Sequence, residues 1–72
     1  MIRRVWLVRY KLKSAGVWSD EWTVNFAATD RIDARVLAIS YLQASIDRKL
    51  GMHGIKPGQI SAFKIVSVTP NM

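Results

Sequence analysis

The chain contains no cysteine. Disulfides and thiolate-bound metals are the usual staples of domains this small, and both need that residue. A chain of 72 residues also has room for only one hydrophobic core. We therefore expect a single small domain over residues 1–72 that is stabilised by packing or by self-association. A homodimer is favoured over a monomer on this argument.

Long apolar runs are also missing. The longest, such as residues 36–39, fall far short of the ~20 apolar residues that a membrane-spanning helix needs. Residues 5–8 are too few for the ~7–15-residue apolar core of a signal peptide, and no small-residue cleavage site follows them. These absences predict a cytoplasmic protein that has no membrane partner.

Residues suited to catalysis or metal binding are scarce. The single histidine, His53, has no second histidine, cysteine or acidic cluster at ligand spacing, so we interpret it as a solvated loop residue. Asp20 and Glu21 are adjacent, so on a strand their carboxylates point to opposite faces and cannot act as a pair. No nucleophile elbow or phosphate-binding glycine loop is present in the sequence. We predict a protein that is not an enzyme and that has no catalytic residues, no metal site and no cofactor.

Positive charge, by contrast, is in excess. Eleven lysines and arginines against five acidic residues give a net charge of +6. Five of these cations lie in the first thirteen residues, which contain no acid: Arg3, Arg4, Arg9, Lys11 and Lys13. A concentrated positive patch favours an anionic partner through Coulomb attraction and counterion release, although net charge also serves solubility.

Two segments near the N-terminus have the alternating pattern of strands. Residues 4–12 and 21–28 both place large apolar side chains at even positions. The odd positions hold Val5, Leu7, Arg9 and Lys11 in the first segment and mainly polar residues in the second. Residues 14–16 supply a turn between them. If Tyr10 lies opposite or diagonal to Val24, the apolar side chains of both strands share one face, which predicts a hairpin.

A helix is predicted over residues 31–50. Asp30 is suited to cap its first N–H groups, Asp33 occupies the capping-box position, and Gly51 stands where a left-handed stop is expected. We predict that a stripe of large apolar residues packs on the sheet: Ile32, Val36, Ile39, Leu42, Ile46 and Leu50. Further apolar residues widen this arc: Ala34, Leu37, Ala38, Tyr41 and Ala44. They belong either to the boundary of the core or to an interface with a second subunit or partner.

A final strand is predicted over residues 60–68, after a loop at 51–59 and before Pro70. Its apolar residues change parity, which indicates a central strand, a bulge, or a strand covered on both faces. The predicted fold is α+β, with element order ββαβ. It has a three-stranded antiparallel sheet of strand order 2-1-3, centred on residues 4–12, and one helix packed on one face.

The leading hypothesis for function is contact with nucleic acid through a cationic sheet face. Arg9, Lys11 and Lys13 share the odd-numbered face of the first strand at ~6.6 Å spacing, which can follow phosphates along a strand. Arg3 and Arg4 stand at its start and complete the candidate nucleic-acid-binding set. The alternative is that these cations simply solvate the open face of the sheet.

A protein-interaction module is the second hypothesis. Val5 and Leu7 lie on the same predicted face as the cations, and an apolar patch rimmed by cations also suits a protein partner. With Tyr41 of the wide helix arc they form the candidate protein-interface set. Such a protein would act as an inhibitor or adaptor, as small phage or mobile-element accessory proteins of this size do. Trp18, in the first loop, is either an exposed contact residue or, as we prefer, a lid over the end of the hairpin.

Overall fold

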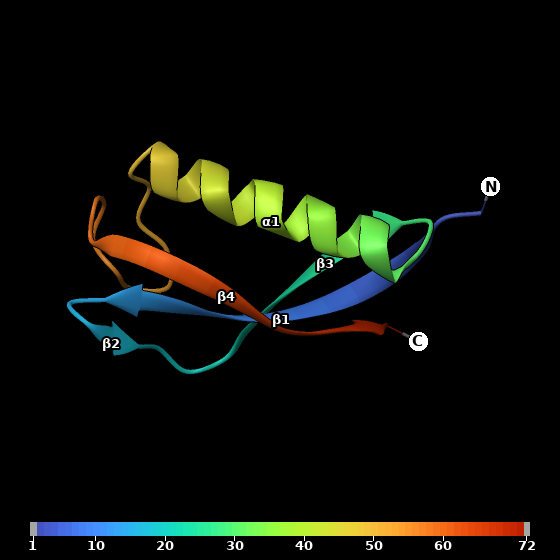
Figure 1. The fold of residues 1–72 in the computed structure, drawn as a ribbon, viewed down its shortest axis with the longest axis horizontal. Helices are drawn as coiled ribbons and strands as arrows, with labels where there is room; N and C mark the ends of the chain where they lie inside the picture. Colours follow the sequence, from blue (N-terminus) through green and yellow to red (C-terminus); the bar gives the residue numbers. More distant parts are fainter. Residues whose placement is uncertain (1, 72) are drawn as a thin grey trace.

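A computed structural model describes residues 2–71, and it consists of an antiparallel sheet with one helix lying along one of its faces (Figure 1). The elements, in chain order, are β1 (Arg4–Ser14), β2 (Val17–Trp18), β3 (Trp22–Ala28), α1 (Arg31–Asp47) and β4 (Ile60–Pro70). The two-residue strand β2 adds a fourth strand to the three that were predicted. The α+β class is confirmed, with one helix packed against an open sheet.

The first strand occupies the centre of the sheet. β1 pairs antiparallel with β3 along one edge and with β4 along the other. The short strand β2 pairs with Lys13 and Ser14, the last two residues of β1. Because both long neighbours run antiparallel to β1, they are parallel to each other. This is the predicted order, with the strand near residues 4–12 in the middle.

The hairpin has the predicted pairing of faces. Val8 lies opposite Val24, and Tyr10 lies opposite Trp22, so Tyr10 is diagonal to Val24. Ala15 and Gly16 form the turn with φ of +52° and +77°, the left-handed pair that a tight two-residue hairpin turn requires. A loop over residues 19–21 then separates β2 from β3.

A bulge in β4 explains its mixed parity. The register passes from Tyr10 opposite Ile65 to Arg9 opposite Ser67, which leaves Val66 without a partner on β1. One extra residue reverses which positions face the helix. Phe63 and Ile65 before the bulge pack against one core cluster, and Val68 after it packs against the other.

The helix begins as predicted and ends earlier. The Asp30 side chain accepts a hydrogen bond from the Asp33 backbone N–H at 2.8 Å, which caps the N-terminus. At the other end α1 stops at Asp47, three residues before the predicted boundary at Leu50, because Lys49 takes the left-handed conformation with φ +56°. Gly51 has a different role: a Cβ atom there would lie 2.7 Å from the carbonyl oxygen of Ile55, so the glycine permits a close backbone approach.

The face of α1 that packs on the sheet is not the predicted one. Its buried residues are Ala34, Ala38, Leu42 and Ser45. Leu42 is confirmed as core, but Ile32 and Val36 are 76% and 54% exposed, and Ile39 is also exposed. The reason is volume: Trp6 and Tyr10 rise from the centre of the sheet and fill the space below the helix, so small side chains fit there.

The core is divided into two clusters along the sheet. Trp6, Ala28 and Ala34 form one, in which the Trp6 indole Nε1–H donates to the Ala28 carbonyl at 3.2 Å. The other is built from Tyr10, Leu12, Leu42 and Ile60. Since the even-numbered residues of β1 supply both clusters, its odd-numbered residues lie on the face turned away from α1.

Candidate nucleic-acid interface

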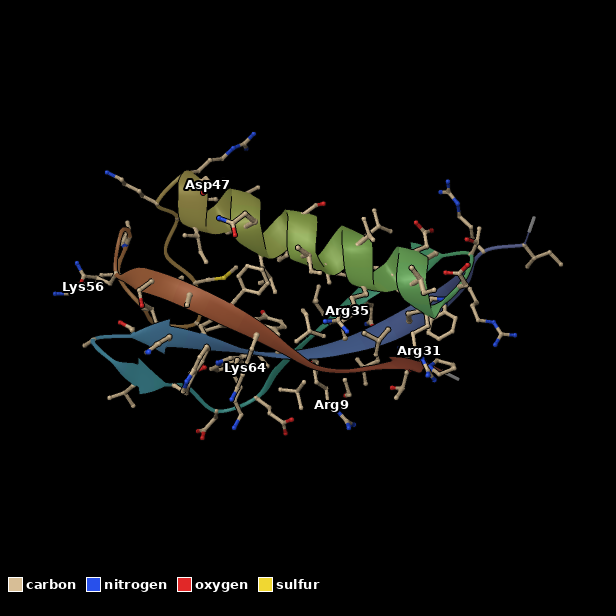
Figure 2. The ribbon with its side chains drawn as sticks, viewed as in Figure 1. Arg9, Arg31, Arg35, Asp47, Lys56 and Lys64 are labelled. Carbon is tan, nitrogen blue, oxygen red and sulfur yellow. The ribbon has the colours of Figure 1, made fainter. Side chains whose placement is uncertain are left out.

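The sheet face turned away from α1, which we call the open face, carries the predicted row of cations. Arg9, Lys11 and Lys13 lie along it on β1, two residues apart. Figure 2 shows Arg9, together with Lys64 of β4, on the side of the sheet away from the helix. The structure therefore brings three of the five predicted nucleic-acid-binding residues onto one surface.

Lys64 is a fourth cation of this face that was not predicted. The register places Lys64 directly opposite Lys11, so the two ammonium groups project from neighbouring positions of adjacent strands. Like charges directly opposite one another in a sheet repel and weaken the pairing. The sequence alone did not show that Lys64 lies on the open face, because the bulge at Val66 changes which face each position of β4 occupies.

Trp18 lies on the open face among these lysines. It pairs with Lys13 across the β1–β2 hairpin, so both side chains leave the sheet on the same side. The Lys64 Nζ atom lies 4.7 Å from the centre of the indole ring, and the Lys13 Nζ atom lies 5.7 Å away. Both distances suit cation–π contact. The ring is 38% exposed, so we assign it to this surface rather than to a lid over the hairpin's end.

Arg3 and Arg4 do not join the row. Arg4 begins β1 opposite Ala28, whose buried position places that pair on the helix side of the sheet. Arg3 precedes the strand, and both side chains are exposed. Five residues separate Arg4 from Arg9, a distance of ~17 Å along a strand. These two arginines lie at one end of the molecule, apart from the four cations of the open face.

The predicted protein-interface residues are divided between two surfaces. Val5 is exposed and Leu7 is half-buried, and both lie on the open face toward the start of β1. Tyr41 is on α1, where its ring meets the edge of Phe26 with 5.9 Å between ring centres. The three residues therefore do not make one patch.

His53 is an exposed loop residue, as predicted, but its ring also contacts the sheet, which was not predicted. Its ring stacks on Trp22 with 4.0 Å between centres and 6° between planes, and its Nε2 atom is 2.5 Å from the Tyr10 hydroxyl. Burial, with a smaller contribution from Tyr41, raises the pKa of Tyr10. The histidine therefore fastens the loop over residues 51–59 to the hairpin. Sequence reasoning missed these contacts because Tyr10 and Trp22 lie far from His53 along the chain.

Residues 2–71 contain neither a pocket nor a cluster of metal ligands. No group of three or more histidine, cysteine, aspartate or glutamate side chains among these residues could hold a metal ion. The helix of this part of the chain is not long and apolar enough to cross a membrane. Comparison of the chain with protein families, with curated proteins and with solved structures gives no match. The open face is therefore argued from its own chemistry.

Proposed function

We propose that this protein binds nucleic acid through the open face of its sheet, with phosphates contacted by Arg9, Lys11, Lys13 and Lys64. The observation that carries the proposal is the placement of Lys11 directly opposite Lys64. Two ammonium groups at neighbouring strand positions repel each other. An anion bound between them attracts both, and these two attractions offset the repulsion. The free protein keeps an unfavourable arrangement that a phosphate relieves.

The shape of the face supports an extended polyanion as the ligand. The cations of β1 repeat at ~6.6 Å along a strand, close to the spacing of successive phosphates in an extended single strand. Trp18 adds an aromatic surface beside them, on which a base can stack. Contacts of this kind follow the backbone and tolerate any base, so we expect affinity without sequence preference.

The experiment is a salt titration of binding. Fluorescence anisotropy of labelled single-stranded DNA, RNA and duplex DNA is measured between ~50 and ~200 mM salt for the parent and for a Lys11→Gln/Lys64→Gln variant. Each lost phosphate contact should lower the slope of log affinity against log salt by ~0.7–0.9. Replacing Arg9, Lys11 and Lys13 together by glutamine should lower it by about three such steps, because the contacts are additive.

The control removes equal charge elsewhere. Arg48→Gln/Lys56→Gln takes away two exposed cations that lie outside the sheet, one at the end of α1 and one in the loop before β4. This variant should keep nearly the parent's slope. If it loses as much slope as the Lys11/Lys64 variant, the effect is one of net charge and the open face is not the site. Absence of measurable affinity in the parent at ~50 mM salt would also refute the proposal.

The second candidate function is that of a protein-interaction module. Exposed Val5 beside Leu7 favours it, because an apolar patch at the edge of a cationic face is a common feature of protein interfaces. The two candidates respond differently to substitution. Leu7→Asp should abolish binding of a protein partner by placing a charge in an apolar contact, whereas the triple glutamine variant should leave that binding largely intact.

A further inference from the structure

The side of α1 not covered by the sheet carries a regular row of large side chains. We call this row the outer seam; its members are Ile32, Val36, Ile39, Gln43 and Ile46. The intervals between them are four, three, four and three residues. This alternation is the pattern of a helix that packs lengthwise against another helix. Four of the five members are apolar, and Ile46 also packs against the core.

The core of the single chain does not account for the outer seam. Small residues, Ala34 and Ala38, face the sheet, while Ile32 and Val36 are mostly in water. A surface helix of a monomer has the opposite distribution, with its larger apolar residues turned inward. Single exposed apolar side chains are ordinary, but a row of them along a helix marks a contact surface.

Charges of opposite sign flank the outer seam. At 100° per residue, Arg31 and Arg35 fall on one side of it, and Asp33 and Asp47 fall on the other. Figure 2 agrees, with Arg31 and Arg35 on the side of the helix nearer the sheet and Asp47 on the side away from it. A partner surface for this face therefore needs an apolar centre with an acidic flank beside the arginines and a basic flank beside the aspartates.

We propose that the partner is a second copy of this chain, with the two outer seams packed together and the two helices parallel. A two-fold axis parallel to α1 brings the arginine flank of each copy against the aspartate flank of the other. An antiparallel pair would instead bring Asp33 close to Asp47 of the other copy and leave Arg31 and Arg35 without an acidic neighbour, which is unfavourable. The same surface serves both copies, as two-fold symmetry requires.

The size of the outer seam sets the strength expected of this dimer. A helix of 17 residues is ~25 Å long and offers a few hundred Å² of apolar surface. Stable interfaces bury ~800 Å² on each partner, so we expect a weaker dimer whose dissociation constant lies in the micromolar range. Gln43 in the middle of the row lowers affinity further and helps to hold one register.

Two experiments test the dimer and its orientation. In sedimentation equilibrium the parent should pass from monomer to dimer as concentration rises through micromolar values, and Val36→Asp should remain monomeric. Because Val36 is already exposed, this variant should unfold at the same urea concentration as the parent when both are dilute. Ala44→Asp, an exposed helix position outside the outer seam, is the matched control and should still dimerise.

The absence of cysteine allows orientation to be read by single-cysteine cross-linking. In the parallel dimer position 36 of one copy faces position 36 of the other, so Val36→Cys should oxidise to a covalent dimer much faster than Ala44→Cys. In an antiparallel dimer position 36 would face position 46, and a mixture of Val36→Cys and Ile46→Cys would give mainly the mixed disulfide. The proposal would be overturned by that mixed disulfide, by equal rates of oxidation at positions 36 and 44, or by a parent that stays monomeric at ~100 µM. None of these measurements involves nucleic acid, so they stand or fall separately from the proposed function.

Discussion

Truncation of Leu42 should remove a large part of the stability of this domain. Its side chain is 1% exposed and packs with Tyr10, Leu12 and Ile60. Leu42→Ala deletes three carbon atoms, worth ~0.8 kcal/mol each in transfer from water. The cavity that remains raises the expected loss to about 3–4 kcal/mol. A domain of 72 residues has about 4–11 kcal/mol of stability in total, so this variant should be close to unfolding.

The matched variant is Ile32→Ala, on the same helix. Ile32 is 76% exposed, so its truncation removes little buried surface, and alanine forms helix more readily than isoleucine. We expect a change below about 0.5 kcal/mol. Urea unfolding followed by tryptophan fluorescence measures both, at about 1 µM protein so that dimerisation does not add to stability.

The comparison between the two variants decides which face of α1 is buried. A loss for Ile32→Ala as large as that for Leu42→Ala would mean that the helix is rotated and that the stripe predicted from sequence packs on the sheet. A loss below about 1 kcal/mol for Leu42→Ala would refute the core described above. Unchanged m-values are expected in both variants, since neither alters the surface exposed on unfolding by much.

Three further predictions concern the ends of the elements and the loop before β4. Replacing Lys49, which has φ +56°, by glycine should stabilise the protein by about 0.5–1 kcal/mol in urea unfolding, because glycine adopts this conformation without strain. Gly51→Ala should lower the melting temperature by circular dichroism, at a cost of about 1–3 kcal/mol, since its Cβ would lie 2.7 Å from the Ile55 carbonyl oxygen. Burial raises the folded-state pKa of Tyr10 above its ordinary 10.0, so the stabilisation by its neutral phenol is complete below pH 10.0. This stabilisation should be lost as pH rises through the raised pKa. Tyr10→Phe should therefore weaken the alkaline decline in unfolding free energy.

The sheet could be predicted because its signals are local. Alternation over β1 and β3, a turn at Ala15 and Gly16, and a capped helix each depend on residues close in the chain. With those elements in place, few arrangements of strands remain, which is why the strand order was predicted correctly. The row of Arg9, Lys11 and Lys13 followed from the same period of two.

The rotation of the helix could not be predicted from its own residues. Apolar side chains occur around most of α1, so several stripes satisfy the helical period. The choice between them depends on the volume that Trp6 and Tyr10 already occupy above the sheet, which is a property of a different element. Ala34 and Ala38 are therefore buried, whereas Ile32 and Val36 stay exposed.

The candidate site was predicted only where a single strand defines it. Lys64 opposes Lys11 and approaches the Trp18 ring through the β1–β4 register, which joins distant segments and is shifted by a bulge. The contact of His53 with Trp22 likewise depends on how a loop closes over the hairpin. No pattern within one element carries this information.

The central position of β1 has a consequence for how the chain folds as it is made. β1 pairs with β4 across a long stretch of sequence, so that Trp6 lies opposite Pro70. During synthesis the β1–β3 hairpin leaves the ribosome with one edge of β1 unpaired, and an isolated hairpin is at best marginally stable in water. Non-local pairing of this kind is slow because loop closure is entropically costly before any contact forms. The sheet therefore stays incomplete, with an edge open to aggregation, until β4 has been synthesised.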